Sequence, residues 1–213
     1  MNRHIFILFI LVASLWLALA RLAPGAPDAS RQTAPRMAEV GQPAPDFALP
    51  DLNGKMVRLS DFKGKQVVLE WFNPDCPFVK FAHSKGPLRD MAARYAKMGI
   101  VWLAINSGAP GKQGHGVERN RAAAKEYGMA HPILLDESGQ VGRQYGAKAT
   151  PHMYLIDDKG VLRYRGALDN APMGETSETP VNYVDAALED LKAGRPVRTS
   201  ETRAYGCSVK YGS

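Results

Sequence analysis

The sequence predicts an α/β fold in which a central mixed β-sheet has helices on both faces. Residues 67–72 and 100–105 are apolar at nearly every position, which is typical of strands buried on both faces of a sheet. Residues 88–98 have apolar side chains at helical spacing, and 117–127 are rich in alanine. A strand pair follows at 152–164, so strands and helices alternate along the chain, as they do in α/β domains.

The domain begins with a predicted β-hairpin. Residues 47–59 contain two short apolar segments around Asn53-Gly54, a dipeptide that strongly favours tight hairpin turns. Because this hairpin precedes the strand at 67–72, we expect it to be an N-terminal extension of the central sheet's domain.

The middle of the chain alternates between short helices and strands. A break at Gly86-Pro87 precedes the helix expected over 88–98, and Gly128 closes the helix expected over 117–127. Further elements are a strand at 132–135, a helix at 138–145, and hairpin strands at 152–156 and 161–164 around Asp157-Asp-Lys-Gly160. The apolar face of the helix at 88–98 consists of Leu88, Met91, Ala92, Tyr95 and Met98.

The last predicted helix has start and stop signals. Thr179 can cap the helix, Pro180 suits the first helical position, and Gly194 ends it. Its buried stripe is expected to contain Val181, Val184, Leu188 and Leu191.

The N-terminus resembles a targeting segment. Ile5 to Ala20 is a run of sixteen residues without charge, shorter than a comfortable membrane span, and Ala18-Leu19-Ala20 offers a cleavage site. We therefore expect a signal peptide at 1–20, with an uncleaved membrane anchor as the alternative. Either one places the protein outside the cytoplasm, in the periplasm or on the outer face of the cytoplasmic membrane. Residues 21–38 are rich in proline and alanine and are expected to form a flexible linker.

We therefore expect one domain over 39–194 and a C-terminal tail over 195–213 that carries Cys207. The net charge is +6, from 27 Lys and Arg against 21 Asp and Glu. Basic residues become denser toward the end of the chain but are not interleaved with aromatic residues, which favours a solvated tail over a nucleic-acid site. They are Arg195, Arg198, Arg203 and Lys210.

Cys76 lies where a strand is expected to turn into a helix. Asn73-Pro74-Asp75 ends the strand, and Pro77 suits the first turn of a helix. Unpaired N–H groups and the helix dipole at that place favour a thiolate, so a partly exposed Cys76 would be a nucleophile with a lowered pKa. The alternative is a small, buried apolar residue without a chemical role.

Two other sequence patterns bear on possible binding sites. The glycines at 108, 111, 114 and 116 fit neither a dinucleotide-binding nor a P-loop spacing, which indicates a mobile surface loop. Cys76 and His83 are seven residues apart, roughly 10.5 Å along a helix, too far to hold one metal ion together. A copper site would need a ligand from elsewhere, such as His131 or His152.

Several motifs resemble those of a known family. Taken together they are similar to the thioredoxin fold in its redoxin branch, the alkyl hydroperoxide reductase/thiol-specific antioxidant family. The resemblance covers about residues 39 to 213. The motifs are Gly41-Gln-Pro-Ala-Pro-Asp-Phe47, Leu59-Ser-Asp-Phe-Lys-Gly-Lys65, the Cys76 corner, Ile105-Asn-Ser107, Ala149-Thr150-Pro151 and Gly206-Cys-Ser-Val-Lys-Tyr211.

This resemblance implies roles for particular residues. Thr150 and Pro151 would form a loop with a cis peptide bond that faces Cys76. Glu70 matches the position of a buried acid under the active site. Burial would raise the pKa of Glu70, so that it could exchange protons with a reacting sulfur. The alternative is a structural carboxylate paired with a lysine.

The chain also departs from the family patterns. Val79 occupies the place of the second cysteine of a Cys-x-x-Cys motif, so no neighbouring thiol can resolve an adduct on Cys76. Asn73 and Leu69 occupy the places of the Thr or Ser and the Pro that peroxiredoxins use around the peroxide. Efficient peroxide reduction is therefore not expected, although a thiolate can react slowly with peroxide.

We expect a thiol–disulfide oxidoreductase, an antioxidant redoxin of the cell envelope that uses no cofactor. Cys76 would be the nucleophile and would act on protein or small-molecule thiols, disulfides or peroxide, with an external reductant not identified. Cys207 is the only other sulfur nucleophile, and its chain can reach roughly 45 Å from the last helix. A resolving cysteine, a permanent structural disulfide and a free tail thiol all remain open. The alternative function is a copper-binding or non-catalytic binding module.

Overall fold

The computed structural model of the protein describes residues 36–213. The predicted signal peptide or anchor, and most of the predicted linker, lie outside the described residues. Ala38 is only 4% exposed, and its N–H donates to the Gln144 carbonyl at 2.9 Å. The linker boundary predicted after residue 38 is therefore too late in the chain. Within 36–213, no helix is long and apolar enough to cross a membrane.

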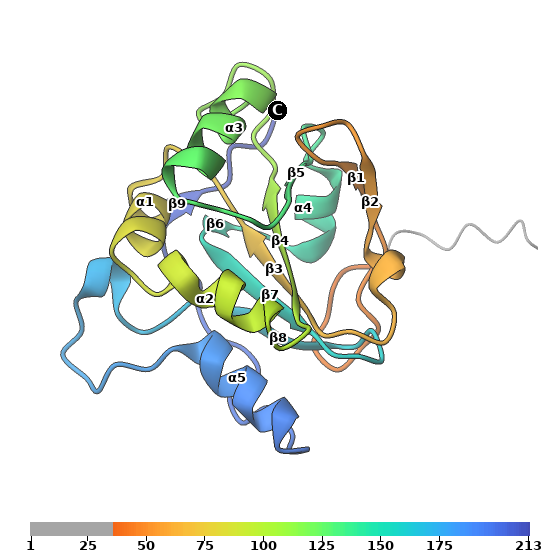
Figure 1. The fold of residues 1–213 in the computed structure, drawn as a ribbon, viewed down its shortest axis with the longest axis vertical. Coiled ribbons are helices and arrows are strands. Elements are labelled where there is room, and N and C mark those ends of the chain that lie inside the picture. Colours follow the sequence, from red (N-terminus) through yellow and green to blue (C-terminus); the bar gives the residue numbers. More distant parts are fainter. Residues whose placement is uncertain (1–35) are drawn as a thin grey trace, which may run out of the picture. The chain divides into compact units, whose positions relative to one another are not determined.

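A five-stranded mixed sheet forms the centre of the domain (Figure 1). β3 lies in the middle, pairing parallel with β4 and antiparallel with β7, and all its residues are buried. The apolar run at 67–72 is thus explained, because such a strand contacts the protein core on both faces. In spatial order the strands are β5 (Ile133–Leu135), β4 (Val101–Asn106), β3 (Val67–Trp71), β7 (His152–Ile156) and β8 (Leu162–Gly166).

Helices cover both faces of this sheet, as predicted. α4 and the N-terminal hairpin lie on one side, where Tyr145 packs against Trp71 and Tyr154 (Figure 1). On the other side, α2 and α5 share a core with Val68, and α3 packs nearby with Ala104. The helices are α1 (Pro77–Ser84), α2 (Leu88–Ala96), α3 (Val117–Glu126), α4 (Gln140–Tyr145) and α5 (Tyr183–Lys192), with 3₁₀ turns at Leu59–Phe62 and Pro172–Gly174.

The hairpin predicted around Asn53-Gly54 is confirmed. β1 (Ala48–Pro50) and β2 (Met56–Arg58) pair antiparallel, and Leu49 opposite Val57 places an apolar pair in the core. Gly54 has a φ of 78°, a conformation that glycine adopts without steric cost. The hairpin thereby extends the apolar core beyond the central sheet.

α2 and α5 differ from their predictions at one end each. α2 ends at Ala96, and Met98 is 50% exposed in the turn that follows, so it does not belong to the buried face. α5 begins with Asn182 as its N-cap, whose side chain accepts from the N–H groups of Val184 and Asp185.

The capping role predicted for Thr179 and Pro180 is wrong because the chain before α5 is extended. The Val181 N–H donates to the Asn170 side chain at 2.8 Å, and the Val181 carbonyl accepts from the Asn170 N–H. These bonds hold Val181 outside the helix with 38% of its surface exposed, so it is not part of the buried stripe. Gly194, with a φ of 67°, follows the helix end as predicted.

The C-terminal segment is solvent-accessible, as predicted for its basic residues, but it is fixed to the domain by specific contacts. Its first residues are held by Asp190 near the end of α5, which pairs with Arg195 at 2.8 Å and Arg198 at 3.1 Å. Farther along, β9 (Cys207–Ser208) pairs antiparallel with β6 (Ala149–Thr150). This pairing brings the end of the chain to the Cys76 corner.

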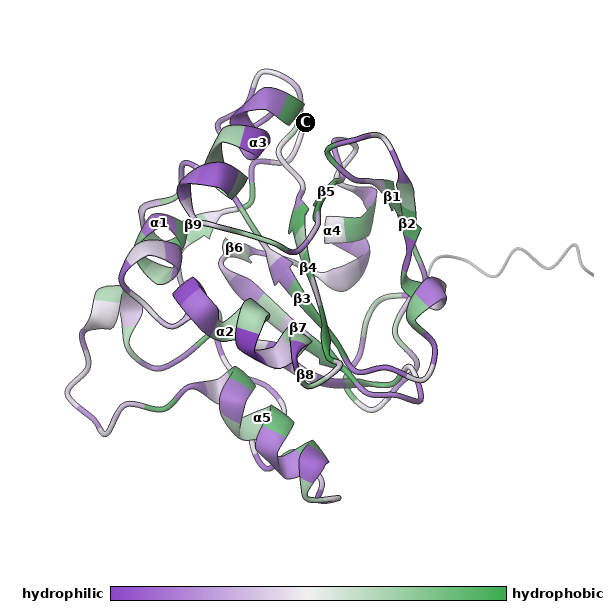
Figure 2. Cartoon of the chain, viewed as in Figure 1, coloured by the Kyte–Doolittle hydropathy of each residue, from purple (hydrophilic) through white to green (hydrophobic). Residues whose placement is uncertain are grey.

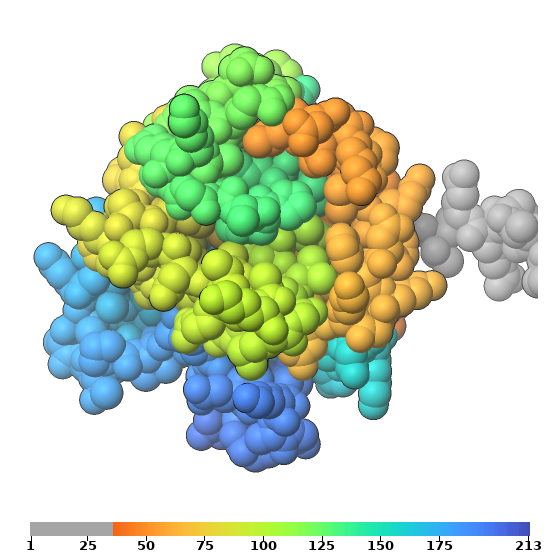
Figure 3. Space-filling model, viewed as in Figure 1, coloured from red at the N-terminus to blue at the C-terminus, as the bar shows by residue number. Residues whose placement is uncertain are grey.

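The exposed faces of the helices are polar and contain specific side-chain contacts. α3 is mostly hydrophilic in Figure 2, since only Asn120 and Ala123 of its residues are buried. In Figure 3, α5 packs directly beneath α2, where Asp185 accepts from Arg94 and from the Tyr95 hydroxyl. These contacts join the two helices at their exposed edge.

Candidate active site

The Cys76 corner is built by its local sequence. After β3 the Asn73 side chain accepts from the Asp75 N–H at 2.9 Å, and the Asn73 carbonyl accepts from the Cys76 N–H at 3.1 Å. Pro77 occupies the first position of α1, with Cys76 as the N-cap. The predicted strand-to-helix corner is therefore confirmed.

Cys76 is more buried than predicted. Its exposed fraction is 0%, where partial exposure was expected. Its thiol donates to the Thr150 carbonyl at 3.0 Å, and the peptide bond between Thr150 and Pro151 is cis, as the resemblance implied. The cis-proline loop and the nucleophile candidate thus face one another.

Cys207 covers this site. In the β6–β9 pairing it lies opposite Thr150, whose carbonyl also holds the Cys76 thiol. Burial, the hydrogen bond to Cys76 and the charge of Cys76 raise the pKa of Cys207 to about 11. Both cysteines are free thiols. The idea of a tail thiol that never meets Cys76 is therefore wrong.

Gly206 allows the close approach of this segment. Its φ is 120°, and a Cβ atom there would lie 2.1 Å from the Thr150 carbonyl oxygen. No side chain fits at that distance. Glycine at this position therefore lets the backbone of the C-terminal segment approach Thr150 closely.

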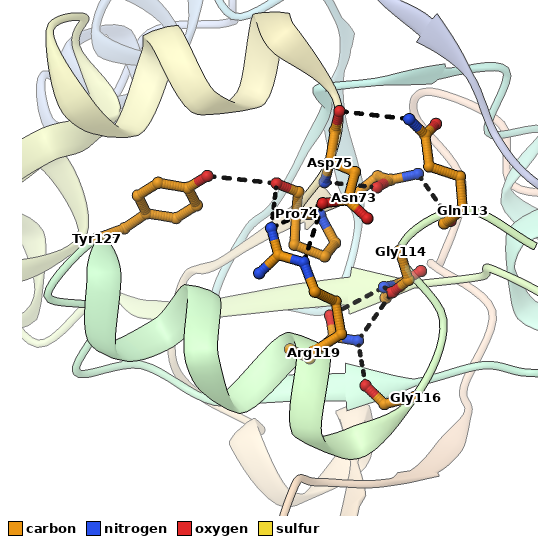
Figure 4. Close-up of polar contacts among 10 residues, drawn as sticks. Asn73, Pro74, Asp75, Gln113, Gly114, Gly116, Arg119 and Tyr127 are labelled. Atoms are coloured by element: carbon orange, nitrogen blue, oxygen red, sulfur yellow. Dashed lines mark hydrogen bonds and ion pairs between the residues drawn. The ribbon is translucent and has the colours of Figure 1, made fainter.

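Arg119 supports the corner from α3 (Figure 4). Its guanidinium donates to the Asp75 carboxylate at 2.9 Å and to the Pro74 carbonyl at 3.1 Å. The Tyr127 hydroxyl donates to the same Pro74 carbonyl at 3.3 Å. This role of Arg119 could not be predicted, because nothing in the local sequence distinguishes it from a surface arginine on a polar helix.

The glycine-containing loop at 107–116 is anchored, contrary to the mobile loop predicted. Asn106 donates to the Gly114 carbonyl at 2.9 Å, and Asn120 donates to it at 3.0 Å. On the other side, the Asn73 amide donates to the Gln113 carbonyl at 3.2 Å, as Figure 4 shows. The Asn73 side chain is thus occupied in positioning the corner and this loop.

Glu70 lies under the sheet, but its surroundings differ from both predicted ones. It accepts from His83 at 2.7 Å and from the Trp102 indole at 3.0 Å. Burial alone would raise its pKa, but the attraction of His83 and these hydrogen bonds outweigh burial, so the pKa of Glu70 is lowered. Glu70 also meets α1 at His83, roughly 10.5 Å along the helix from Cys76. The predicted rise in pKa and the predicted lysine partner are both wrong.

The two histidines named as possible copper ligands, His131 and His152, contact other core side chains. The Nδ1 atom of His152 is 3.2 Å from the Tyr154 hydroxyl, and His131 packs against the rings of His83 and Trp102. Burial lowers the pKa of both His131 and His152 to about 4. Among residues 36–213, no group of three or more His, Cys, Asp or Glu side chains is arranged to hold a metal ion.

The chain resembles known proteins in sequence and structure. Among related sequences, thiol-disulfide oxidoreductase ResA of Geobacillus thermodenitrificans is 35% identical over 125 residues, covering 58% of this chain and 67% of that protein. Chloroplastic peroxiredoxin Q of Triticum aestivum is 31% identical over 135 residues, covering 58% of this chain and 57% of that protein. The solved structure of the hypothetical protein SMc02350 from Sinorhizobium meliloti 1021 superposes with a TM-score of 0.72 at 30% identity, covering 84% of this chain and 97% of that one.

The family match itself spans residues 40–165, more than half of the 213 residues. It includes the hairpin, the Cys76 corner and the cis-proline loop, and it ends before the segment that carries Cys207. With its thioredoxin-like fold, the chain belongs to the AhpC/TSA family.

Proposed function

We propose that the protein is a thiol–disulfide oxidoreductase in which Cys76 is the nucleophile and Cys207 resolves the adduct formed on it. The observation that carries this proposal is geometric: β9 places Cys207 opposite Thr150, whose carbonyl accepts from the Cys76 thiol at the N-terminus of α1, and Cys207 packs against the cluster that contains Cys76. A helix N-terminus stabilises a thiolate, and a second thiol in contact is placed to attack a disulfide on the first. The related thiol-disulfide oxidoreductase supports the same chemistry.

The exchange proceeds in two balanced steps. The Cys76 thiolate attacks one sulfur of a substrate disulfide, forming a mixed disulfide and releasing the other sulfur as a thiolate, which takes up a proton. Cys207 then loses its proton and attacks the Cys76 sulfur, which releases the remaining substrate thiolate and forms the Cys76–Cys207 disulfide. The substrate gains two electrons and the protein dithiol loses two. Run backwards, the same steps oxidise a substrate dithiol.

The pKa of Cys207 explains why it reacts second. Besides burial, which is the largest cause, the hydrogen bond to Cys76 and the charge of Cys76 raise the pKa of Cys207. Both causes disappear once Cys76 is in a mixed disulfide. With its pKa raised to about 11, Cys207 is protonated beside free Cys76, and its thiol becomes more acidic once Cys76 is in the mixed disulfide that Cys207 attacks.

Among the substrates of this chemistry we favour disulfides over peroxides. Asn73 lies three residues before Cys76, and its side chain is bound to the Asp75 N–H and the Gln113 carbonyl. Its oxygen and its amino group are thus each bound to the backbone, and it lacks the hydroxyl that Thr or Ser would supply to orient a peroxide. With peroxide, the expected reaction is slow formation of a sulfenic acid on Cys76, which Cys207 would convert to the same disulfide with loss of water.

Peptide mapping of the oxidised monomer tests the proposal. After oxidation with a small disulfide reagent, the wild type should yield a Cys76–Cys207 crosslink, and redox titration should place its potential between roughly −120 and −270 mV. Cys207→Ser should accumulate the mixed disulfide on Cys76, whereas Cys76→Ser should form no internal disulfide, and any reagent adduct should map to Cys207. An oxidised wild type without the crosslink would show Cys76 to be a one-cysteine centre, and a potential below about −300 mV would show a structural bond.

We further infer that the protein is exported. The support is the uncharged run at residues 5–20 and the cleavage pattern Ala18-Leu19-Ala20. N-terminal sequencing of the protein from a cell-envelope fraction should find Arg21 as the first residue. Retention of residues 1–20 on a membrane-bound protein would indicate the anchor, and recovery from the cytoplasm would contradict export.

A further inference from the structure

The last residues of the chain dock on α4 through Tyr211. The ring of Tyr211 lies where α4 and the residue before it have glycines: a Cβ atom on Gly139 would be 2.6 Å from the ring, and one on Gly142 would be 2.5 Å from its hydroxyl. The hydroxyl donates to the Ala147 carbonyl at 2.8 Å. Gly139, Gly142 and the Ala147 carbonyl thus form a site that fits this one side chain, which we call the Tyr211 seat.

Arg143 closes this seat from the outside. Its guanidinium carbon lies 4.7 Å from the centre of the Tyr211 ring, and it donates to the Gly212 carbonyl at 2.8 Å. The cation therefore binds both the ring and the backbone that follows it. The seat holds Tyr211 by shape, by a hydrogen bond and by a cation–π contact.

Cys207 lies between this anchor and a second fixed point. On its N-terminal side, Gly206 is pressed against the Thr150 carbonyl. On its C-terminal side, the Val209 N–H donates to the Lys148 carbonyl at 3.3 Å, and the Lys210 carbonyl accepts from the Ala109 N–H at 2.9 Å. Only three residues separate Cys207 from Tyr211, so fixing Tyr211 restricts where the Cys207 sulfur can go.

We propose that Tyr211 is a positioning residue that holds β9 against β6 and thereby sets both the resolving power of Cys207 and the access of external molecules to Cys76. The first of these two effects rests on the proposed function. The second does not, because it concerns only how the docked segment covers Cys76.

The physical basis is a docking equilibrium. A docked β9 keeps the Cys207 sulfur at high effective concentration beside Cys76, which favours the internal disulfide over mixed disulfides with external thiols. The same docked state leaves Cys76 fully buried, so an external disulfide reaches it only when the segment lifts. Weakening the Tyr211 seat should therefore destabilise the internal disulfide and expose Cys76 at the same time.

The first experiment measures the equilibrium of the full chain with a reference dithiol. Tyr211→Ala should lower the equilibrium constant for forming the Cys76–Cys207 disulfide by about tenfold or more. Tyr211→Phe keeps the ring and its contact with Arg143, so the equilibrium constant of this variant should stay close to that of the wild type. Arg143→Met tests the seat without changing the tail and should give a smaller loss in the same direction.

The second experiment measures the alkylation rate of Cys76 in the Cys207→Ser background, where no internal disulfide can form. Adding Tyr211→Ala should accelerate alkylation at least tenfold, whereas adding Tyr211→Phe should change it little. Tyr183→Ala is the matched control, because Tyr183 is the first residue of α5 and is partly buried against a different core cluster from the one around Cys76. It should lower the melting temperature without accelerating alkylation.

The outcomes separate the two proposals. If the wild type forms no Cys76–Cys207 disulfide, the proposed function fails, but the alkylation experiment still decides the role of Tyr211. If Tyr211→Ala and Arg143→Met change neither the disulfide equilibrium nor the alkylation rate, the positioning role is overturned. It is also overturned if Tyr183→Ala accelerates alkylation as much as Tyr211→Ala, because the effect would then reflect general loss of stability.

Discussion

At the scale of single residues, the two cysteines differ by their surroundings more than by their sequence context. Cys76 has a helix N-terminus and a carbonyl acceptor, whereas Cys207 is partly buried on a two-residue strand. The pKa of Cys207, raised to about 11, depends on its neighbour. Of these features, the helix N-terminus supports the proposed attacking role of Cys76, with Cys207 as the proposed resolving thiol.

Removal of Cys76 should therefore acidify Cys207. In Cys76→Ser the charge is gone, so the pKa of Cys207 should fall from about 11 toward its ordinary value, without reaching it because burial persists. The measurement is the alkylation rate of Cys207 as a function of pH, compared with the reduced wild type. An unchanged profile would mean that burial alone raises the pKa.

Glu70 is expected to stabilise the fold. Its two oxygens bind His83 and Trp102 in a fully buried site, and Glu70→Gln removes the charge that His83 pairs with. The expected loss is about 2 kcal/mol in the free energy of unfolding, measured by chemical denaturation. A double-mutant cycle with His83→Gln should show that the two losses are not additive.

The pH profile of thiol exchange tests whether Glu70 also transfers protons. We expect Glu70→Gln to leave this profile unchanged, since both carboxylate oxygens already have donors. A shifted profile at unchanged stability would instead assign a proton-transfer role to the carboxyl group.

At the scale of elements, the predictions were right where the signal is local. The apolar run of β3, the Asn53-Gly54 turn and the proline after Cys76 each determine structure within a few residues. The start of α5 was missed because Asn170, eleven positions before Val181, holds the preceding chain extended. A proline at a plausible first helical position is then outweighed by pairing with a distant residue.

The C-terminal segment is a second case in which distant residues, and not the local sequence, determine the structure. Gly206 and Cys207 could be identified from their residue types and from the family resemblance. The docking of Tyr211 could not, because its seat consists of glycines on and just before α4, and a small residue carries no sequence signal for what fills its space. The partners of Asp190 were likewise unpredictable, since Arg195 and Arg198 read as part of a basic tail.

Asp190 should fasten the start of this segment to α5. The hydrogen bonds from Arg198 and Arg195 lower the pKa of Asp190 to about 2. A lowered pKa means that the contribution to stability is present above the ordinary carboxyl value and is lost as the pH falls through about 2. Asp190→Asn should therefore accelerate hydrogen exchange over residues 195–203 at neutral pH.

The neighbouring Glu189 is the matched control for this variant, because its side chain is exposed at the end of the same helix. Glu189→Gln should leave the exchange of 195–203 unchanged. Equal effects of the two substitutions would indicate a general influence of charge on the segment.

At the scale of the whole molecule, the candidate site combines parts that are far apart in sequence. Cys76 comes from the corner after β3, Thr150 from β6 and Cys207 from β9. The sheet places the first two together, and the packed C-terminal segment adds the third. For this reason composition and periodicity predicted the sheet and the corner, whereas the assembled site needed the structure.

Buried histidines should make the stability of the whole domain depend on pH. Burial lowers the pKa of His131 and His152 to about 4 from an ordinary value near 6.5, so the unfolded chain takes up protons in this range and the folded protein does not. Stability should then be complete above about pH 6.5 and should fall as the pH decreases toward about 4. Each histidine should contribute roughly 2 kcal/mol of this loss between pH 6.5 and 4.5.

Denaturation with urea at several pH values measures this dependence. His152→Gln keeps a hydrogen-bonding partner for the Tyr154 hydroxyl but cannot be protonated, so it should make the slope of unfolding free energy against pH shallower. His131→Gln should have a similar effect and, at a separate site, the two changes should add. If neither substitution alters the slope between pH 6.5 and 4.5, these imidazoles are protonated in the folded protein as readily as in the unfolded chain, and the acid sensitivity must arise from the carboxylates.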